Sequence, residues 1–169
     1  MLTLVRKPSV LFICFAAAAF AATKPDFSGT YTAQQKNDSK STAASVVLRV
    51  VQSDSAVEVT RVNGDKSTTN RFPLDGSEGD YTTETGVRGK CKAHVKNETL
   101  VLESLVASPG RTDRPSIRFH TTEQWQLSLD RNTLTIKTDI KSPDMPPDVM
   151  AAAFPNNPRT EKYQRTDKP

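Results

Sequence analysis

Glu123 is the residue of this chain whose position most strongly suggests chemistry. It falls between Phe119 and Leu127 on the apolar side of an alternating segment, and Trp125 is the next residue on that side. An unpaired carboxylate buried there would cost several kcal/mol or would take up a proton. Glu123 must therefore meet an oppositely charged partner, water or a ligand.

Arg61 is the nearest candidate for that partner, because it is in phase with Val57 and Val59 on another alternating segment. Two interpretations stay open. In the first, Glu123 forms an internal pair with Arg61 or lies in water near the rim of the fold. In the second, the two side chains form a polar anchor in a cavity and hold the head group of a mostly apolar molecule. Glu103, in phase with Val101 and Leu105, raises the same question.

Catalytic and metal-binding chemistry find little support in the sequence. His94 and His120 both fall on the polar side of their segments, where a solvated histidine is the ordinary outcome. There is no glycine-flanked serine of the nucleophile-elbow type, no Gly-rich phosphate loop and no recognisable spacing of metal ligands. Cys91 shares a side with Ala93 and Val95, which predicts a buried, unreactive thiol. We therefore predict a non-enzymatic protein with no catalytic residue, metal or cofactor.

Residues 1–21 have the pattern of an export signal. Arg6 and Lys7 provide a basic start, Ser9 to Phe20 is an apolar run, and Ala19-Phe20-Ala21 supplies small residues at the two positions that a signal peptidase reads. The run is shorter than the roughly 20 residues that cross a bilayer. We expect cleavage near residue 21 and a domain over residues 22–169. The expected location is the periplasm or the outside of the cell, with no membrane span after cleavage.

The charge pattern argues against a nucleic-acid partner. The whole chain has a net charge of +4, and the predicted signal carries two of its positive charges. Lysine and arginine are scattered among aspartate and glutamate, without a basic run or interleaved aromatic residues. Of the two cysteines, only Cys91 lies beyond the predicted signal, so no intramolecular disulfide is expected.

Alternation with a period of two recurs along nearly all of residues 22–169 and predicts about nine or ten short strands. Ile117 to Leu129 alternates most clearly, and Asn63-Gly64-Asp65 is a typical hairpin turn. Successive hairpins must hide their edges. We therefore predict an all-β fold, an antiparallel up-and-down β-barrel in which the first and last strands pair. A two-sheet sandwich is the alternative.

The segment from Ser142 to Pro158 departs from this alternation. Pro146 and Pro147 can begin a helix, because the first helical turn leaves its amide hydrogens unused. A short helix is expected over Asp148–Phe154, ended by Pro155. Two roles stay open for the segment: a capping turn that plugs one barrel end, or a mobile lid over a cavity.

Four short motifs resemble an exported, bacterial, lipocalin-like (calycin-type) domain family of largely unknown function. They are Asp26-Phe27-Ser28-Gly29-Thr30-Tyr31, residues 99–104, residues 125–130 with 134–136, and Glu161-Lys162-Tyr163. The resemblance implies a small antiparallel barrel, and it also implies a late arginine, here Arg165, over the aromatic residue near the start. Tyr31 replaces the usual tryptophan of the opening motif, and the segment 142–158 is longer than in that family.

These observations together predict an exported, non-enzymatic barrel that binds a small, partly hydrophobic ligand in its interior. Its expected contacts are Trp125 and Phe119 as cavity wall, Tyr31 as floor, and Glu123 with Arg61 as polar groups. The alternative is a structural or interaction module of the cell envelope, with a filled barrel and no ligand. A hydrolase or isomerase would require a histidine that faces Glu123, and the alternation places both histidines on the other side.

Overall fold

A computed structural model describes residues 24–34, 46–110 and 116–167, so the predicted signal segment 1–21 lies outside the described residues. The described part consists of ten strands and one short helix, α1 (Pro147–Ala153). The strands are β1 (Gly29–Ala33), β2 (Val47–Gln52), β3 (Ala56–Asn63), β4 (Lys66–Pro73), β5 (Gly79–Thr82), β6 (Arg88–Lys96), β7 (Thr99–Ala107), β8 (Arg118–Leu127), β9 (Thr133–Lys141) and β10 (Arg159–Arg165).

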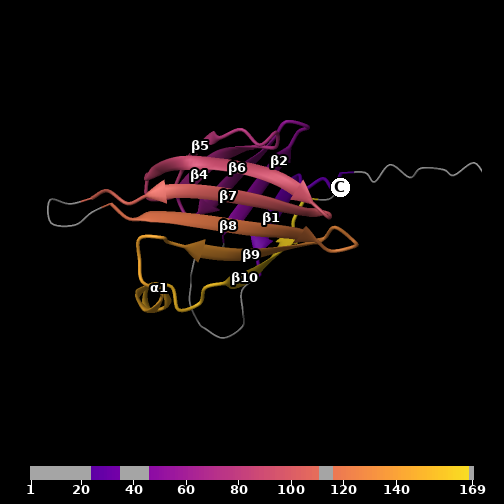
Figure 1. The fold of residues 1–169 in the computed structure, drawn as a ribbon. Helices are drawn as coiled ribbons and strands as arrows, with labels where there is room; N and C mark the ends of the chain where they lie inside the picture. Colours follow the sequence, from indigo (N-terminus) through magenta and orange to yellow (C-terminus); the bar gives the residue numbers. More distant parts are fainter. Residues whose placement is uncertain (1–23, 35–45, 111–115, 168–169) are drawn as a thin grey trace, which may run out of the picture.

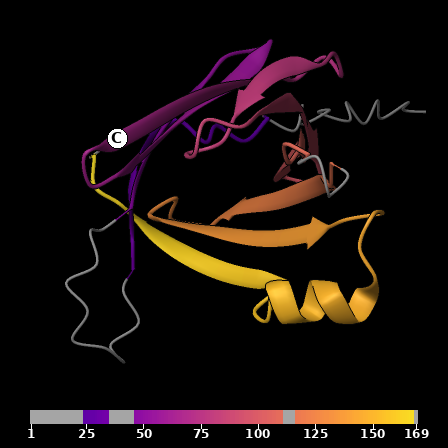
Figure 2. The same ribbon diagram turned by 90° about the vertical axis from the view of Figure 1, so that its left-hand side faces the viewer.

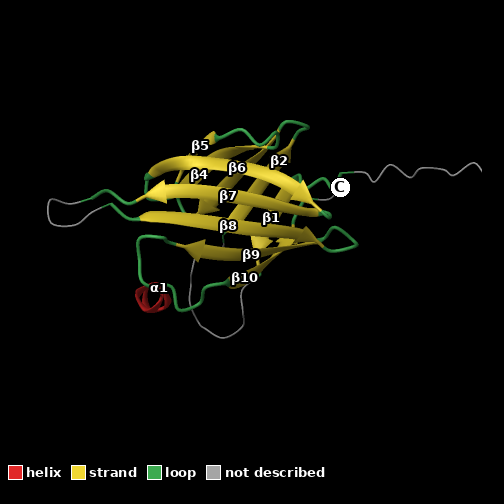
Figure 3. Ribbon diagram, in the orientation of Figure 1, coloured by secondary structure: helices red, strands yellow, loops and turns green. Residues whose placement is uncertain are grey.

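All ten strands form one antiparallel sheet that curls round on itself (Figures 1 and 3). The order is β4-β3-β2-β1-β10-β9-β8-β7-β6-β5, so each neighbour in space is a neighbour in sequence except where β1 meets β10. Tyr31 of β1 lies opposite Arg165 of β10, which joins the first and last strands. The predicted up-and-down barrel is confirmed, and the two-sheet sandwich is wrong.

The barrel has two different ends. The segment before β1 and the turns β2–β3, β4–β5, β6–β7 and β8–β9 lie at one end, which we call the packed end. The segment that contains α1 lies at the other, the helix end (Figure 1), together with the β3–β4 and β5–β6 turns. Five large side chains near the packed end are completely buried: Phe27, Tyr31, Leu100, Trp125 and Leu134. The core of the protein therefore closes this end with tightly packed side chains.

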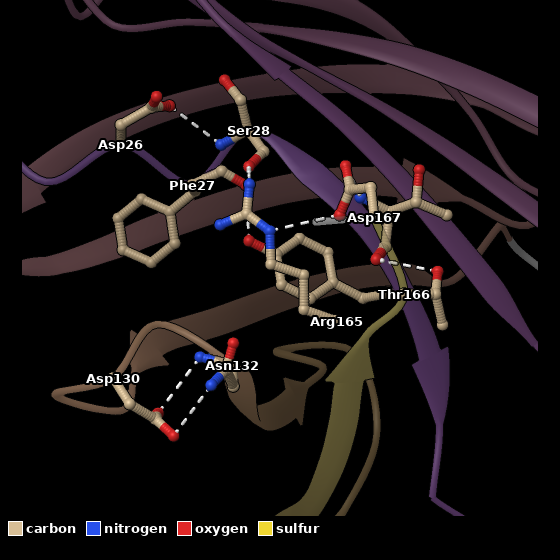
Figure 4. A network of polar contacts seen from close by, with 10 residues as sticks. Asp26, Phe27, Ser28, Asp130, Asn132, Arg165, Thr166 and Asp167 are labelled. Atoms are coloured by element: carbon tan, nitrogen blue, oxygen red, sulfur yellow. Dashed lines mark hydrogen bonds and ion pairs between the residues drawn. The ribbon is translucent and has the colours of Figure 1, made fainter. Parts of the chain in front are cut away.

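Arg165 clamps the packed end (Figure 4). Its guanidinium carbon lies 5.7 Å from the ring centre of Tyr31, and its Nη2 donates a 2.6 Å hydrogen bond to the carbonyl oxygen of Ser28. Asp167 accepts hydrogen bonds from Arg165 Nε (3.1 Å) and from the amide of Thr30 (2.9 Å). The contact of Arg165 with Tyr31 is the one that the family resemblance implied, and it ties the two ends of the barrel chain together.

The barrel is closed between β4 and β5 by a side chain, because these strands are the two ends of the hydrogen-bonded order. Asn70 of β4 is 8% exposed. Its side-chain amide makes the hydrogen bonds to Thr82 of β5 that the backbone of a neighbouring strand would otherwise make. Its Nδ2 donates to the carbonyl oxygen of Thr82 (2.9 Å), and its Oδ1 accepts from the amide of Thr82 (2.7 Å). One asparagine therefore satisfies two backbone groups that the sheet leaves unpaired.

Replacing Asn70 with alanine is expected to lower the free energy of unfolding by about 2 kcal/mol, because both backbone groups of Thr82 lose their partner. Amide hydrogen exchange in β5 should accelerate more than exchange in β8. Urea unfolding and exchange mass spectrometry measure the two effects. Thr60→Ala is the matched control, since it removes only the hydrogen bond to Thr69 on the outer face. Equal effects of the two substitutions would show that Asn70 does not close the barrel.

The helix end carries α1 beside the strands. The expected helix over 148–154 is observed one residue earlier, with Pro147 in its first turn and Phe154 at its end. Phe154 packs edge-to-face on Phe119 of β8, with ring centres 5.9 Å apart. Figure 2 looks at this end and shows α1 below β9 and β10, outside the ring of strands. A role as a plug or as a lid stays a prediction.

No helix in the described part of the chain is both long and apolar enough to span a membrane.

Candidate functional site

An ion pair crosses the interior of the barrel. Arg61 comes from β3 and Glu123 from β8, two strands that are not neighbours in the sheet. Arg61 Nη2 donates to both carboxylate oxygens of Glu123, at 2.8 and 2.6 Å, and the indole Nε1 of Trp125 donates to Glu123 Oε2 at 2.9 Å. Alternation along β3 and β8 turns both charged side chains inward, and Arg61 is the partner of Glu123 that the sequence pattern indicated.

Electrostatics favours the charged form of Arg61. Burial by itself would lower the pKa of Arg61, but the adjacent carboxylate of Glu123 outweighs burial and raises that pKa above its ordinary value. Each side chain retains exposed surface, 21% for Arg61 and 18% for Glu123. Since both point into the barrel, this surface means that water reaches the interior. The Nε and Nη1 atoms of Arg61 have no hydrogen-bond partner among the described residues.

Two tyrosines complete the polar lining, and sequence reasoning missed both. Tyr163 of β10 donates its hydroxyl hydrogen to Glu161 at 3.0 Å; burial, followed by the Glu161 charge, raises the pKa of Tyr163. Burial also raises the pKa of Tyr81 on β5, whose ring packs edge-to-face on Phe72. One signal was present for Tyr163: it shares a strand face with Arg165, which the resemblance had placed over the barrel end.

The five predicted ligand contacts fall into three groups. Arg61 and Glu123 come together in the interior, and Phe119 lies half-buried at the helix end against Phe154. Tyr31 and Trp125 have no exposed surface at all. In this structure a ligand could touch neither of them directly, so they belong to the packed support beneath the ion pair. Trp125 is linked to the interior surface by the hydrogen bond that its indole donates to Glu123.

A pocket of about 740 Å³ lies at the helix end, between α1, the start of β8 and the end of β9. Its lining is mostly apolar and includes Ile140, Met145, Pro147, Met150, Ala151 and Phe154. Ile140 pairs with Thr121 in the sheet, while Thr138 pairs with Glu123. Ile140, one of the lining residues, is therefore one inward-facing position along β9 from Thr138, the residue opposite Glu123.

The remaining candidates for reactivity are not arranged for it. His94 and His120 lie exposed on the outer face, so neither meets Glu123 as the hydrolase alternative required. Cys91 is 2% exposed; burial raises the pKa of its thiol to about 11, which leaves little thiolate at neutral pH. Within the described ranges no three His, Cys, Asp or Glu side chains are grouped so that they could hold a metal ion.

Comparison with known proteins identifies the fold but no family. No protein-family model matches the sequence, and no curated protein matches it. A solved structure described as "REP1-NXSQ fatty acid transporter" superposes with a TM-score of 0.56 at 12% identity, over 85% of this chain and 98% of that one. A point mutant of the same transporter gives 0.54 at 12% identity, over 83% and 98%. At such identity the likeness shows the barrel fold alone, and no family match supports the resemblance to exported bacterial domains.

Proposed function

We propose that this protein binds a small, partly hydrophobic ligand at the helix end of its barrel and catalyses no reaction. The observation that carries the proposal is the position of the Arg61–Glu123 pair. It lies inside the barrel, yet both members keep water-accessible surface, while the packed end below them is completely buried. The apolar part of the ligand would occupy the pocket beside α1, and its polar group would face the ion pair.

Size and fold support this assignment. Pockets that hold small molecules commonly measure about 300–1,000 Å³ and combine an apolar lining with a few polar groups. The pocket beside Ile140 and Phe154 has this volume and composition. The two similar structures are described as a fatty acid transporter, so a protein with this barrel architecture carries that function elsewhere.

A second candidate is a structural or interaction module of the cell envelope. The complete burial of Tyr31 and Trp125 favours it, because side chains that fill the packed end leave no room there for a ligand. For either candidate we propose export through the signal-like residues 1–21 and a location in the periplasm or outside the cell.

Binding of Nile red, a neutral polarity-sensitive dye, distinguishes the two candidates. We expect saturable, one-to-one binding, and native mass spectrometry of freshly purified protein should show a bound molecule. Ala151→Trp, which fills the pocket, should weaken dye binding at least about tenfold, equivalent to about 1.4 kcal/mol. Val149→Trp is the matched control on the same helix, because Val149 is 44% exposed and does not line the pocket.

If the purified protein carries nothing and binds no dye, the ligand-binding proposal fails and the filled-barrel module is favoured. Equal weakening by Ala151→Trp and Val149→Trp would place binding away from the pocket. Circular dichroism of both variants confirms that each retains the barrel.

A further inference from the structure

The charges around the proposed site are already balanced. Arg61 lies in the interior, Lys141 lines the pocket, and Arg118 and Arg159 begin the neighbouring strands β8 and β10 at the helix end. A carboxylate contacts each of these four cations: Arg61–Glu123 at 2.6 Å, Arg118–Asp144 at 2.7 Å, Lys141–Asp139 at 3.1 Å and Arg159–Glu161 at 3.8 Å. His120, at the edge of the pocket, is exposed to solvent. Among these described groups, no cation is left free to neutralise an incoming anion.

Hydrogen-bonding groups, by contrast, remain available. Arg61 uses Nη2 for Glu123, which leaves the hydrogens of Nε and Nη1 for an acceptor other than the described residues. Glu161 accepts the hydroxyl of Tyr163 and retains further lone pairs. A hydroxyl or carbonyl oxygen could accept from Arg61, and a hydroxyl could also donate to a carboxylate. A ligand carboxylate would instead add a negative charge close to Glu123 and Glu161 in a partly dehydrated space, which is unfavourable.

We propose, on the basis of the binding function above, that this site selects neutral amphiphiles over carboxylates. The preferred ligand is an alcohol, ester or amide with an apolar chain, and a fatty acid anion is disfavoured. Glu123 is the residue that sets this preference, because its carboxylate cancels the charge that would otherwise attract an anionic head group. Trp125 supports this role by holding Glu123 in place through its indole hydrogen bond.

Competition against bound Nile red tests the preference, using decanol and decanoate as probes of equal chain length. For the wild type at about pH 8, decanol should displace the dye at a concentration at least about tenfold lower than decanoate. Decanoate should displace it more effectively when the pH is lowered to about 5, where more of this ligand is protonated and uncharged. Nile red is neutral, so its own binding serves as the reference at each pH.

Glu123→Gln removes the negative charge while its amide oxygen can still accept the hydrogen bond from Trp125. Arg61 then carries an unbalanced positive charge. Decanoate should bind this variant at least about tenfold more tightly than it binds the wild type, while decanol changes less than about threefold. Comparing the same ligand between two proteins removes the difference in hydrophobicity between the probes. Glu103→Gln is the control, because Glu103 pairs with Lys92 on the outer face.

The outcomes separate the two proposals. Binding of neither probe nor dye would overturn the binding function, and this inference with it. The selection of neutral ligands would be overturned, with the binding function intact, by either of two results. In the first, decanoate binds the wild type as tightly as decanol does. In the second, Glu123→Gln does not improve decanoate binding. If Glu123→Gln does not fold, the wild-type pH series decides: decanoate that binds equally well or better at about pH 8 contradicts the inference.

Discussion

Replacing Trp125 with alanine is expected to lower the free energy of unfolding by about 3–5 kcal/mol, the largest effect of any single substitution that we predict. Trp125 is completely buried, so alanine would leave a cavity within the packed end. The substitution also removes the hydrogen bond that Nε1 donates to Glu123. Urea unfolding followed by far-ultraviolet circular dichroism measures the effect, since this residue is the only tryptophan of the chain and its fluorescence is lost.

Trp125→Phe separates packing from hydrogen bonding. Phenylalanine keeps most of the ring volume but has no N–H group, so we expect a loss of about 1–2 kcal/mol. Leu129→Ala is a surface control, because Leu129 is fully exposed. If Trp125→Ala is no more harmful than Leu129→Ala, the packed end is not the centre of stability that its burial indicates.

The second large effect concerns the internal ion pair. Arg61→Met is expected to lower the free energy of unfolding by about 3 kcal/mol, because it leaves the half-buried carboxylate of Glu123 without its cation. Glu123→Leu should cost a similar amount, because it leaves the guanidinium of Arg61 and the indole N–H of Trp125 without their hydrogen-bond acceptor. The double variant should cost about 3–4 kcal/mol rather than the roughly 6 kcal/mol of two independent changes, because neither charge is then left without its partner. About 1 kcal/mol of that cost comes from the unpaired indole.

A double-mutant cycle measures this coupling directly, with an expected value of about 2–3 kcal/mol. The exposed pair of Lys92 and Glu103, at 3.1 Å, provides the matched cycle on the outer face and should give less than about 1 kcal/mol. Similar coupling in the two cycles would mean that the interior of the barrel is as well hydrated as its surface.

Much of the fold could be predicted from alternation, because the side chains of a strand point to opposite faces. The expected strand over 117–129 is observed as Arg118–Leu127. Alternation also placed Arg61 and Glu123 on inward faces, where a buried carboxylate requires a partner, and the two do meet. β5 is short, Gly79–Thr82, because the chain turns at Gly86, whose φ of 82° suits glycine.

What the sequence by itself determined is therefore the set of strands, their up-and-down order and the inward direction of the two charged residues. Only the tertiary structure decided how deep each inward residue lies. Tyr31 and Trp125 share an inward direction with Glu123, yet they are completely buried while Glu123 keeps water contact. The depth of a side chain in the barrel, and its distance from side chains on the opposite wall, depend on the tilt and stagger of the strands in the closed sheet. Tilt and stagger bring together residues that are far apart in the chain. For the same reason, the closure of β4 on β5 by Asn70 and the pocket beside α1 emerge only when the whole barrel is assembled.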